Sequence, residues 1–199
     1  MTKLMLATFN KNKAKELKAR LRSFKGVKVC NMEDLKGDLP MLIEDGKTFR
    51  QNAVKKAVTV SRYFDGLVLA DDSGLEVEAL HGKPGVRSAR FARKNATDSE
   101  NNTKLVKLMS KIPDGKRSAR FVCILALAKK GRLLSTFEGK VSGIITTKNK
   151  GRNGFGYDPL FIPVNHEKTF AEMTPAYKNR ISHRSQAMAQ LKRSIQKYL

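Results

Sequence analysis

Two adjacent aspartates that follow an apolar run are the residues best suited to chemistry. Leu67–Ala70 is typical of a short buried strand, and Asp71, Asp72, Ser73 and Gly74 follow it directly. Neighbouring carboxylates repel each other unless a positive group compensates, and hard divalent cations bind such oxygens. Open α/β sheets also bind ligands beyond their strand ends. The stretch therefore predicts a metal-binding acidic site at a strand end, and a turn with solvated aspartates is the alternative.

A lysine-bearing turn near the N-terminus is a second candidate, for anion binding. Lys3–Ala7 predicts a strand, and apolar residues at helical spacing predict a helix over Ala14–Ser23. The turn between them, Thr8–Lys13, would present backbone N–H groups and the positive end of a helix dipole to an anion. Because it lacks the glycines of a Walker loop, an ordinary capped helix is the alternative.

Two later segments carry side chains suited to a ligand. Gly151–Pro159 is rich in glycine, so its backbone can approach a flat ligand closely, and Phe155 or Tyr157 could stack on a base. A surface loop is the alternative. Ser182 is a plausible N-cap for a helix over 184–197, which would place His183 and Arg184 at a helix N-terminus. Their donors and the helix dipole would favour an anion or a carbonyl oxygen there.

The remaining patterns predict a mixed α/β chain organised as one domain. Val27–Cys30 and Phe121–Ala128 are typical of strands, and a turn at Lys130-Gly131 predicts a hairpin with a strand over 133–141. Helices are predicted over Phe49–Tyr63 and from a capping box at Thr97 to about residue 111. Glu44 lies in the loop before the first of these helices and matters only if the fold brings it to Asp72.

Composition bounds the class of protein and its partners. The chain has 40 Lys and Arg against 18 Asp and Glu, a formal charge of +22, which attracts polyanions such as nucleotides or nucleic acid. The basic residues are spread along the chain, and the few aromatic residues do not alternate with them. Cys30 and Cys123 lack metal-ligand spacing, which predicts reduced thiols in a cytoplasmic protein. No signal peptide and no membrane span is expected.

Five motifs in one order resemble a known family. The chain is similar to the noncanonical purine nucleoside triphosphate pyrophosphatases, the inosine/xanthosine triphosphatase or Ham1-like family. The resemblance covers nearly the whole chain, and together the motifs are highly specific. They are Thr8-x-Asn10-x-x-Lys13-x-x-Glu16, Ala70-Asp71-Asp72-Ser73-Gly74-Leu75, Pro84-Gly85-Val86-x-Ser88-Ala89-Arg90-Phe91, Gly154-Phe155-Gly156-Tyr157-Asp158-Pro159 and Ser182-His183-Arg184.

The resemblance implies an α/β fold, elongated and two-lobed, with a central mixed β-sheet flanked by helices and a substrate cleft between the lobes. It implies a single domain over residues 1–199, a homodimer, and Mg²⁺-dependent hydrolysis of inosine, deoxyinosine and xanthosine triphosphates to monophosphate and pyrophosphate. Such an activity keeps these nucleotides out of nucleic acid. Asp72 corresponds to the general base, and Glu44 with Asp72 to the metal-binding carboxylates. The substrate-contacting positions are Thr8, Phe9, Asn10, Lys11, Asn12, Lys13, Ser73, Phe155, Gly156, Tyr157, Asp158, Lys178, His183 and Arg184.

This assignment predicts a mechanism in which Asp72 deprotonates water, the water attacks the α-phosphorus, and pyrophosphate leaves. Donors aimed at a purine 6-oxo group would select the base, and His183 or Arg184 with amides near 155–158 are the candidates. Adenine would leave such donors unpaired, at a cost of roughly 1–3 kcal/mol per group.

Two positions depart from the family pattern. Phe9 stands where glycine is common, and Gln51 stands where a helix glutamate is common. If that acid assists the metal, metal affinity or rate would fall. Two alternatives therefore stay open: a basic nucleic-acid-binding protein on this scaffold with weakened catalysis, or a related pyrophosphatase for another modified nucleotide.

Overall fold

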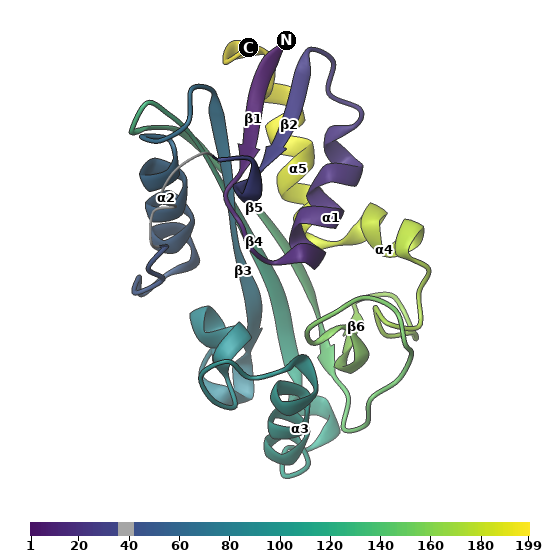
Figure 1. Ribbon diagram of the computed structural model, residues 1–199. Coiled ribbons are helices and arrows are strands. Elements are labelled where there is room, and N and C mark those ends of the chain that lie inside the picture. Colours follow the sequence, from purple (N-terminus) through teal and green to yellow (C-terminus); the bar gives the residue numbers. More distant parts are fainter. Residues whose placement is uncertain (36–41) are drawn as a thin grey trace. The chain divides into compact units, whose positions relative to one another are not determined.

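The computed structural model of the protein describes residues 1–35 and 42–199 (Figure 1). Its helices and strands alternate along the chain as far as β4, and the strands β5 and β6 and the helices α4 and α5 follow. None of the described helices is long and apolar enough to cross a membrane. In chain order the elements are β1 (Thr2–Leu6), α1 (Lys11–Leu21), β2 (Val27–Asn31), α2 (Phe49–Val60), β3 (Leu67–Val77), α3 (Asp98–Met109), β4 (Ser118–Lys129), β5 (Arg132–Ile145), β6 (Phe161–Pro163), α4 (Pro175–Ile181) and α5 (His183–Ser194).

The strands of the described residues form one mixed sheet in the order β2-β1-β3-β4-β5-β6. Strand β1 pairs in parallel with both β2 and β3, whereas β5 pairs with β6 antiparallel. The turn between β4 and β5 uses Lys130 and Gly131 at positive φ, which confirms the predicted hairpin. The predicted mixed sheet flanked by helices is also confirmed.

The chain divides into two compact units, each assembled from separate stretches of sequence. Unit 1 comprises Met1–Asp72, Cys123–Gly139 and Arg184–Leu199. Unit 2 comprises Ser73–Val122 and Lys140–His183. Strands β3, β4 and β5 each begin in one unit and end in the other, so both units share covalently continuous strands.

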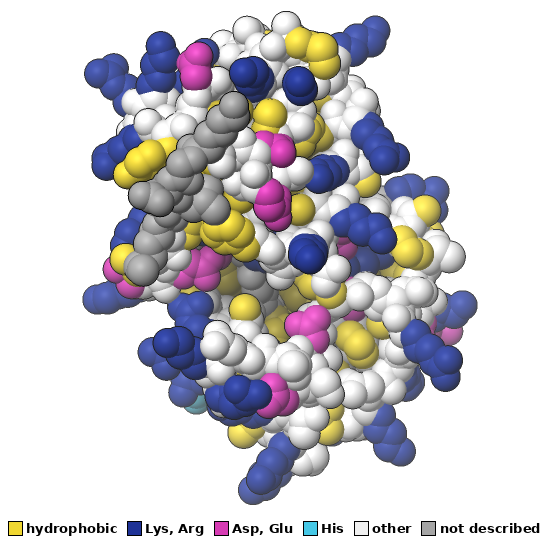
Figure 2. All heavy atoms as spheres, in the orientation of Figure 1, with side chains coloured by type: hydrophobic (Ala, Val, Ile, Leu, Met, Phe, Trp, Pro, Cys, Tyr) yellow, Lys and Arg dark blue, Asp and Glu magenta, His cyan; other side chains and the backbone are white. Residues whose placement is uncertain are grey.

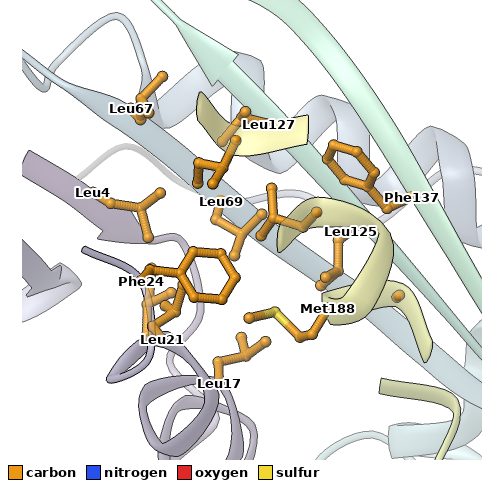
Figure 3. Packing of buried hydrophobic residues seen from close by; sticks show 14 of the residues in the cluster. Leu4, Leu17, Leu21, Phe24, Leu67, Leu69, Leu125, Leu127, Phe137 and Met188 are labelled. Carbon is orange, nitrogen blue, oxygen red and sulfur yellow. The ribbon is translucent and has the colours of Figure 1, made fainter. Parts of the chain in front are cut away.

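In unit 1, helices α1 and α5 pack on the sheet through aliphatic side chains (Figure 3). Leu17 and Leu21 of α1 and Met188 of α5 meet Leu4 and Leu69 of the strands. Met5, which lies between two residues of this cluster on β1, is also fully buried, so neither face of β1 is exposed. A parallel strand in the middle of a sheet is commonly covered on both faces in this way.

In unit 2 the core is more aromatic. Phe121, Phe161 and Phe170 form an interlocking set of rings, with the centroids of Phe121 and Phe161 4.7 Å apart at an edge-on angle of 63°. Leu105 and Met109 of α3 pack into the same cluster. Such ring pairs contribute roughly 0.5–1.5 kcal/mol beyond the area that they bury.

One prediction about the central strand is wrong. The strand was expected to end with the apolar run, before Asp71, but β3 continues without a break through Asp71 and Asp72 to Val77. Two carboxylates can stay inside a buried strand here because cationic side chains from other parts of the chain neutralise them. The alternative of a turn with solvated aspartates is wrong for the same reason, since both side chains are buried.

Helix boundaries differ from the predicted ones at functionally relevant points. Helix α1 begins at Lys11, so Lys11, Asn12 and Lys13 form its first turn instead of the preceding loop. Helix α4, which the sequence analysis did not predict, has a threonine N-cap at Thr174 and proline at its first position, a typical helix start. Ser182, predicted to cap the last helix, follows α4 and stands directly before α5.

Candidate functional site

Asp71 is held in unit 1 by two cations from opposite ends of the chain. Successive strand residues point to opposite faces of a sheet, so Asp71 and Asp72 have different partners. Asp71 accepts from Lys13 Nζ at 2.9 Å on one oxygen and from Arg184 Nε at 2.8 Å on the other. Burial raises its pKa, but the charges of Arg184 and Lys13 outweigh this effect and hold the pKa well below its ordinary value. Asp71 is therefore a permanent anion that positions two cations.

Arg184 lies in this network through a second carboxylate. Its guanidinium also donates to Glu16 of α1. Burial lowers the pKa of Arg184, yet Asp71 and Glu16 raise it above its ordinary value. The sequence analysis named Arg184 beside His183 as a candidate for recognition of the purine, and this stays a prediction. The structure shows Arg184 in contact with two carboxylates of unit 1, which link α1, β3 and α5.

Asp72 lies on the opposite face of β3 and meets helix α2. Lys56 Nζ donates to Asp72 Oδ1 at 3.0 Å, and Asn52 Nδ2 donates to Oδ2 at 3.2 Å. Burial raises the pKa of Asp72 above its ordinary value, repulsion from Glu44 adds to this, and Lys56 acts in the opposite direction. A carboxylate with a raised pKa accepts a proton more readily than an exposed one.

Glu44 contacts the same lysine as Asp72, and the prediction that the two carboxylates share a metal ion stays a prediction. Lys56 Nζ lies 2.6 Å from Glu44 Oε1 and also donates to the backbone carbonyl of Asp71 at 2.9 Å. Burial lowers the pKa of Lys56, but the two carboxylates outweigh burial and raise it. Two carboxylate oxygens therefore converge on one cationic centre in unit 1.

This donor set fits a magnesium ion in its chemistry. Mg²⁺ is a hard cation that is commonly bound by one or two protein carboxylates, with substrate phosphates and waters as its remaining ligands. Glu44 and Asp72 supply two such oxygens around one point. Among residues 1–35 and 42–199 there is no group of three or more His, Cys, Asp or Glu side chains placed to bind a metal.

The turn at the start of α1 has the features of an anion site. Asn10 caps the helix, with its side chain accepting from the Lys13 backbone N–H at 3.0 Å, and Thr8 Oγ1 accepts from the Asn10 N–H. Lys11 and Asn12 are exposed in the first turn. Phe9, at the position where the family commonly has glycine, is 54% exposed and so does not fill the turn.

Gln51 acts as a helix cap. Its side-chain oxygen accepts from the backbone N–H groups of Lys47 and Thr48, while the Thr48 hydroxyl accepts from the Gln51 N–H. This is a reciprocal capping box, and glutamine forms it as well as glutamate does. The departure from the family pattern at Gln51 therefore leaves the local fold intact.

In unit 2 the side chain of Asp158 holds the glycine-rich loop in place. Asp158 accepts from the Phe155 backbone N–H at 2.8 Å and pairs with Lys178 of α4. The Lys178 ammonium also lies 4.8 Å from the centre of the Phe155 ring. The structure thus brings together Phe155, Asp158 and Lys178, three of the predicted substrate-contacting residues.

The middle of this loop is fixed by α3 and by Ser88. The Gly156 N–H donates to Asp98 at 2.7 Å, and its carbonyl accepts from Asn102 at 2.9 Å. The Tyr157 hydroxyl donates to the Ser88 carbonyl at 2.8 Å, and burial, with Asp98 nearby, raises the pKa of Tyr157. These contacts argue against the alternative of a loosely held surface loop.

Two further predicted residues, His183 and Ser73, belong to unit 2. The His183 ring stacks on Phe121, with centroids 4.7 Å apart and planes within 8° of each other, and is almost fully buried. Ser73 is half-buried on β3, directly after Asp72 in the sequence.

Sequence reasoning missed Lys56 and Asn52, although a signal was present. Both lie on the stripe of α2 that also carries Phe49, Ala53 and Ala57, and all five side chains are buried. A lysine at an apolar-stripe position indicates a buried charge that needs an acidic partner. Glu16 and Asp98 were missed because their partners lie far away in the sequence.

The fold and the site together define a mixed α/β protein with a buried carboxylate–lysine centre in one unit and an anchored aromatic loop in the other. The model of the Ham1 family matches residues 4–194, and the chain belongs to this family.

Individual relatives agree with this assignment over their full length. The chain is 46% identical to the dITP/XTP pyrophosphatase of Oceanobacillus iheyensis over 193 residues, which cover 97% of this chain and 98% of that protein. It is similar in structure to a HAM1 protein from Coxiella burnetii, with a TM-score of 0.88 and 38% identity over 99% of this chain and all of that one. The Staphylococcus aureus Ham1 protein gives a TM-score of 0.87 at 34% identity, with the same coverage.

Proposed function

We propose that this chain hydrolyses the triphosphates of inosine, deoxyinosine and xanthosine to the nucleoside monophosphate and pyrophosphate, which keeps these nucleotides out of nucleic acid. The observation that carries the proposal is the convergence of Glu44 and Asp72 on the Lys56 ammonium, at 2.6 and 3.0 Å. It occurs in a chain that is 46% identical to a dITP/XTP pyrophosphatase over nearly its whole length.

Charge complementarity supports a triphosphate ligand. A nucleoside triphosphate carries about four negative charges, and such charges are best met by cations and helix N-termini. Lys13 and the first turn of α1 provide both, and the Asp71 carboxylate 2.9 Å from Lys13 Nζ fixes that ammonium in place. Glu44 and Asp72 are the residues that would hold Mg²⁺. When bound, the ion would offset phosphate charge and polarise the phosphoryl oxygens.

Asp72 is the proposed general base. Asn52 and Lys56 each bond one of its oxygens, so its carboxylate plane is fixed, and burial raises its pKa. In the proposed step a water oxygen bonds to the α-phosphorus while a water proton passes to Asp72. The bond between the α-phosphorus and the bridging oxygen breaks, and that oxygen leaves with pyrophosphate.

Base selection is assigned to residues of unit 2. Phe155 offers a ring face on which a purine can stack, and the Lys178 ammonium, 4.8 Å from the centre of that ring, is a donor suited to a 6-oxo acceptor. The N–H groups of Phe155 and Gly156 already donate to Asp158 and Asp98. A 6-amino purine would leave such donors unpaired, at about 1–3 kcal/mol for each group. Because Arg184 is committed to two carboxylates, we favour His183 over Arg184 as the side-chain donor to the base.

A substrate panel with pyrophosphate detection tests the proposal. Inosine, xanthosine, adenosine and modified pyrimidine triphosphates are compared at saturating Mg²⁺, and we expect turnover of the two oxo-purines only. Equal turnover of a modified pyrimidine would favour the related pyrophosphatase instead.

Asp72→Asn tests the assigned base. The change preserves shape but removes the proton acceptor, so kcat is expected to fall by about 10²–10⁴-fold. Asp65→Asn, the same substitution at an exposed position of unit 1, is the matched control and should leave kcat unchanged. Wild-type turnover by the Asp72→Asn variant would rule out Asp72 as the base.

A homodimer and a cytoplasmic location belong to the same proposal. The homodimer is implied by the family resemblance, and the cytoplasmic location was predicted from the two cysteines, Cys30 and Cys123. Sedimentation equilibrium of the purified chain measures its oligomeric state, and cell fractionation measures its location.

A further inference from the structure

The exposed face of α1 carries a row of basic residues, most of which have no role in the proposed hydrolysis. Lys11, Lys15, Lys18 and Arg22 follow one another at intervals of four, three and four residues, so they share one face of the helix. All four side chains are exposed. In Figure 2 several Lys and Arg side chains gather where Figure 1 shows α1. We call these four residues the α1 basic row.

The row faces a hollow in the surface of unit 1. A groove of about 520 Å³ is lined by the row together with Thr8, Phe9, Asn31 and Glu33. None of the four cations lies within ion-pair distance of a carboxylate from residues 1–35 or 42–199. Four cations against the one carboxylate of Glu33, in a chain of charge +22, make this concave surface attractive to an anionic chain.

The spacing of the row suits a polymer of phosphates. At 1.5 Å per helical residue, the row from Lys11 to Arg22 spans about 16 Å. A stacked nucleic-acid strand advances about 3.4 Å per nucleotide, so about five phosphates would pass along the row. Phe9, which lines the groove and is 54% exposed, presents a ring on which an unpaired base can stack.

A membrane surface suits the row less well. Helices that bind bilayers insert an apolar face, but the apolar residues Leu17 and Leu21 of α1 are buried in the core of unit 1. A flat bilayer also cannot follow a concave groove. We propose that the α1 basic row and Phe9 form a binding surface for single-stranded nucleic acid, which shares Phe9 and Lys11 with the proposed phosphate-binding turn and extends beyond it along α1.

The proposal is tested by the salt dependence of binding. Fluorescence anisotropy of a labelled oligouridylate of about 20 nucleotides gives the affinity of the full chain across a range of salt. Lys15→Gln, Lys18→Gln and Arg22→Gln are combined, because these three positions lie outside the proposed substrate contacts and glutamine preserves helix propensity. Removing three contacts should reduce the slope of log K against log salt by about 2 and weaken binding about 100-fold at 0.1 M salt.

A matched triple variant shows whether nucleic acid binds to the α1 basic row or to the positive charge of the whole surface. Lys107→Gln, Lys111→Gln and Lys116→Gln remove the same charge from exposed positions of unit 2 and should leave the affinity within about threefold. Phe9→Ala should weaken binding about tenfold with little change in the salt slope. Inosine triphosphate turnover and far-UV circular dichroism of both triple variants should equal those of the parent chain.

Three results would overturn the proposal. The first is equal weakening by both triple variants, which would assign binding to diffuse charge. The second is unchanged RNA binding by the α1 variant. The third is sedimentation with phosphatidylserine vesicles that depends on the α1 row while RNA binding does not.

Discussion

The two units bury charge in different surroundings. In unit 1 the buried ions form a connected set that spans both faces of β3 and involves two carboxylates and three cations: Asp71, Asp72, Lys13, Lys56 and Arg184. In unit 2 a buried ion pair, Asp158 with Lys178, lies against aromatic rings. Unit 1 is therefore suited to charge that develops on phosphate, and unit 2 to a flat ring with a few polar edges.

The comparison also separates two ways of making a site rigid. Unit 1 fixes its polar side chains by mutual pairing, so the loss of one ion leaves another buried without its partner. Unit 2 fixes a loop by backbone hydrogen bonds and by glycine conformations, so its vulnerable points are steric. The following substitutions probe these differences, from the largest effect to the smallest.

Asp71→Ala should produce the largest loss of stability. It leaves Arg184 and Lys13 without their shared carboxylate in a buried setting, which costs about 3–5 kcal/mol of the free energy of unfolding. Guanidinium denaturation measures the loss. Asp45→Ala is the control, because Asp45 pairs with Lys55 on the surface, where ion pairs contribute little. Equal losses in the two variants would mean that the connected set of charges does not stabilise unit 1.

Gly154→Ala should destabilise unit 2 through a steric clash. Gly154 has φ +78°, and an added Cβ would lie 2.0 Å from Asp158 Oδ2, which Phe155 and Lys178 hold in place. The expected loss is about 3 kcal/mol from strain and overpacking together. Gly156→Ala is the matched control, since Gly156 has φ +62° with open space around it, and should cost about 1 kcal/mol. Thermal unfolding of both variants distinguishes clash from backbone strain.

Phe155→Ala sharpens the contrast in function. If unit 2 recognises the base and unit 1 performs the chemistry, the KM for inosine triphosphate should rise about tenfold while kcat changes little. The control is Tyr63→Ala, which removes an exposed aromatic ring from unit 1 and should alter neither constant. A fall in kcat with unchanged KM would indicate that Phe155 acts in the chemical step and not in binding of the base.

The two cysteines offer the mildest probe of burial in unit 1. Cys123 is fully buried and donates to Asp71 at 3.3 Å, and burial, followed by the charge of Asp71, raises its pKa well above its ordinary value. Cys30 is half-buried. At mildly alkaline pH a disulfide reagent should therefore label Cys30 in the folded protein and Cys123 only after unfolding. Rapid labelling of both thiols would show that unit 1 opens readily.

The sequence predicted what local patterns determine. Helix starts at Thr48 and Thr97, the hairpin at Lys130-Gly131 and the mixed α/β class follow from residues close to one another in the chain. The family resemblance located Glu44, which the structure places with Asp72 on one lysine.

Other features depended on partners that no local pattern reveals. The continuation of β3 through its aspartates needs Arg184, which lies 113 residues beyond Asp71. Because of this sequence separation, the contacts of Arg184 with carboxylates could not be predicted from its place at the start of a helix. Lys56 is a partial case. Its position in an apolar stripe predicts that its side chain is buried, but it does not identify the acidic partners.

The discontinuous composition of unit 1 has a consequence for how the molecule is made. Its core needs α5, whose Ala187, Met188 and Leu191 are synthesised after every residue of unit 2. Unit 2 can therefore be complete in a nascent chain while the apolar side chains of β1 and α1 are still not covered by α5. Thr2 and Leu199 then meet through a hydrogen bond, with both ends side by side in Figure 1. Because unit 1 brings together segments far apart in the sequence, we expect it to fold slowly and its exposed sheet to bind chaperones during synthesis.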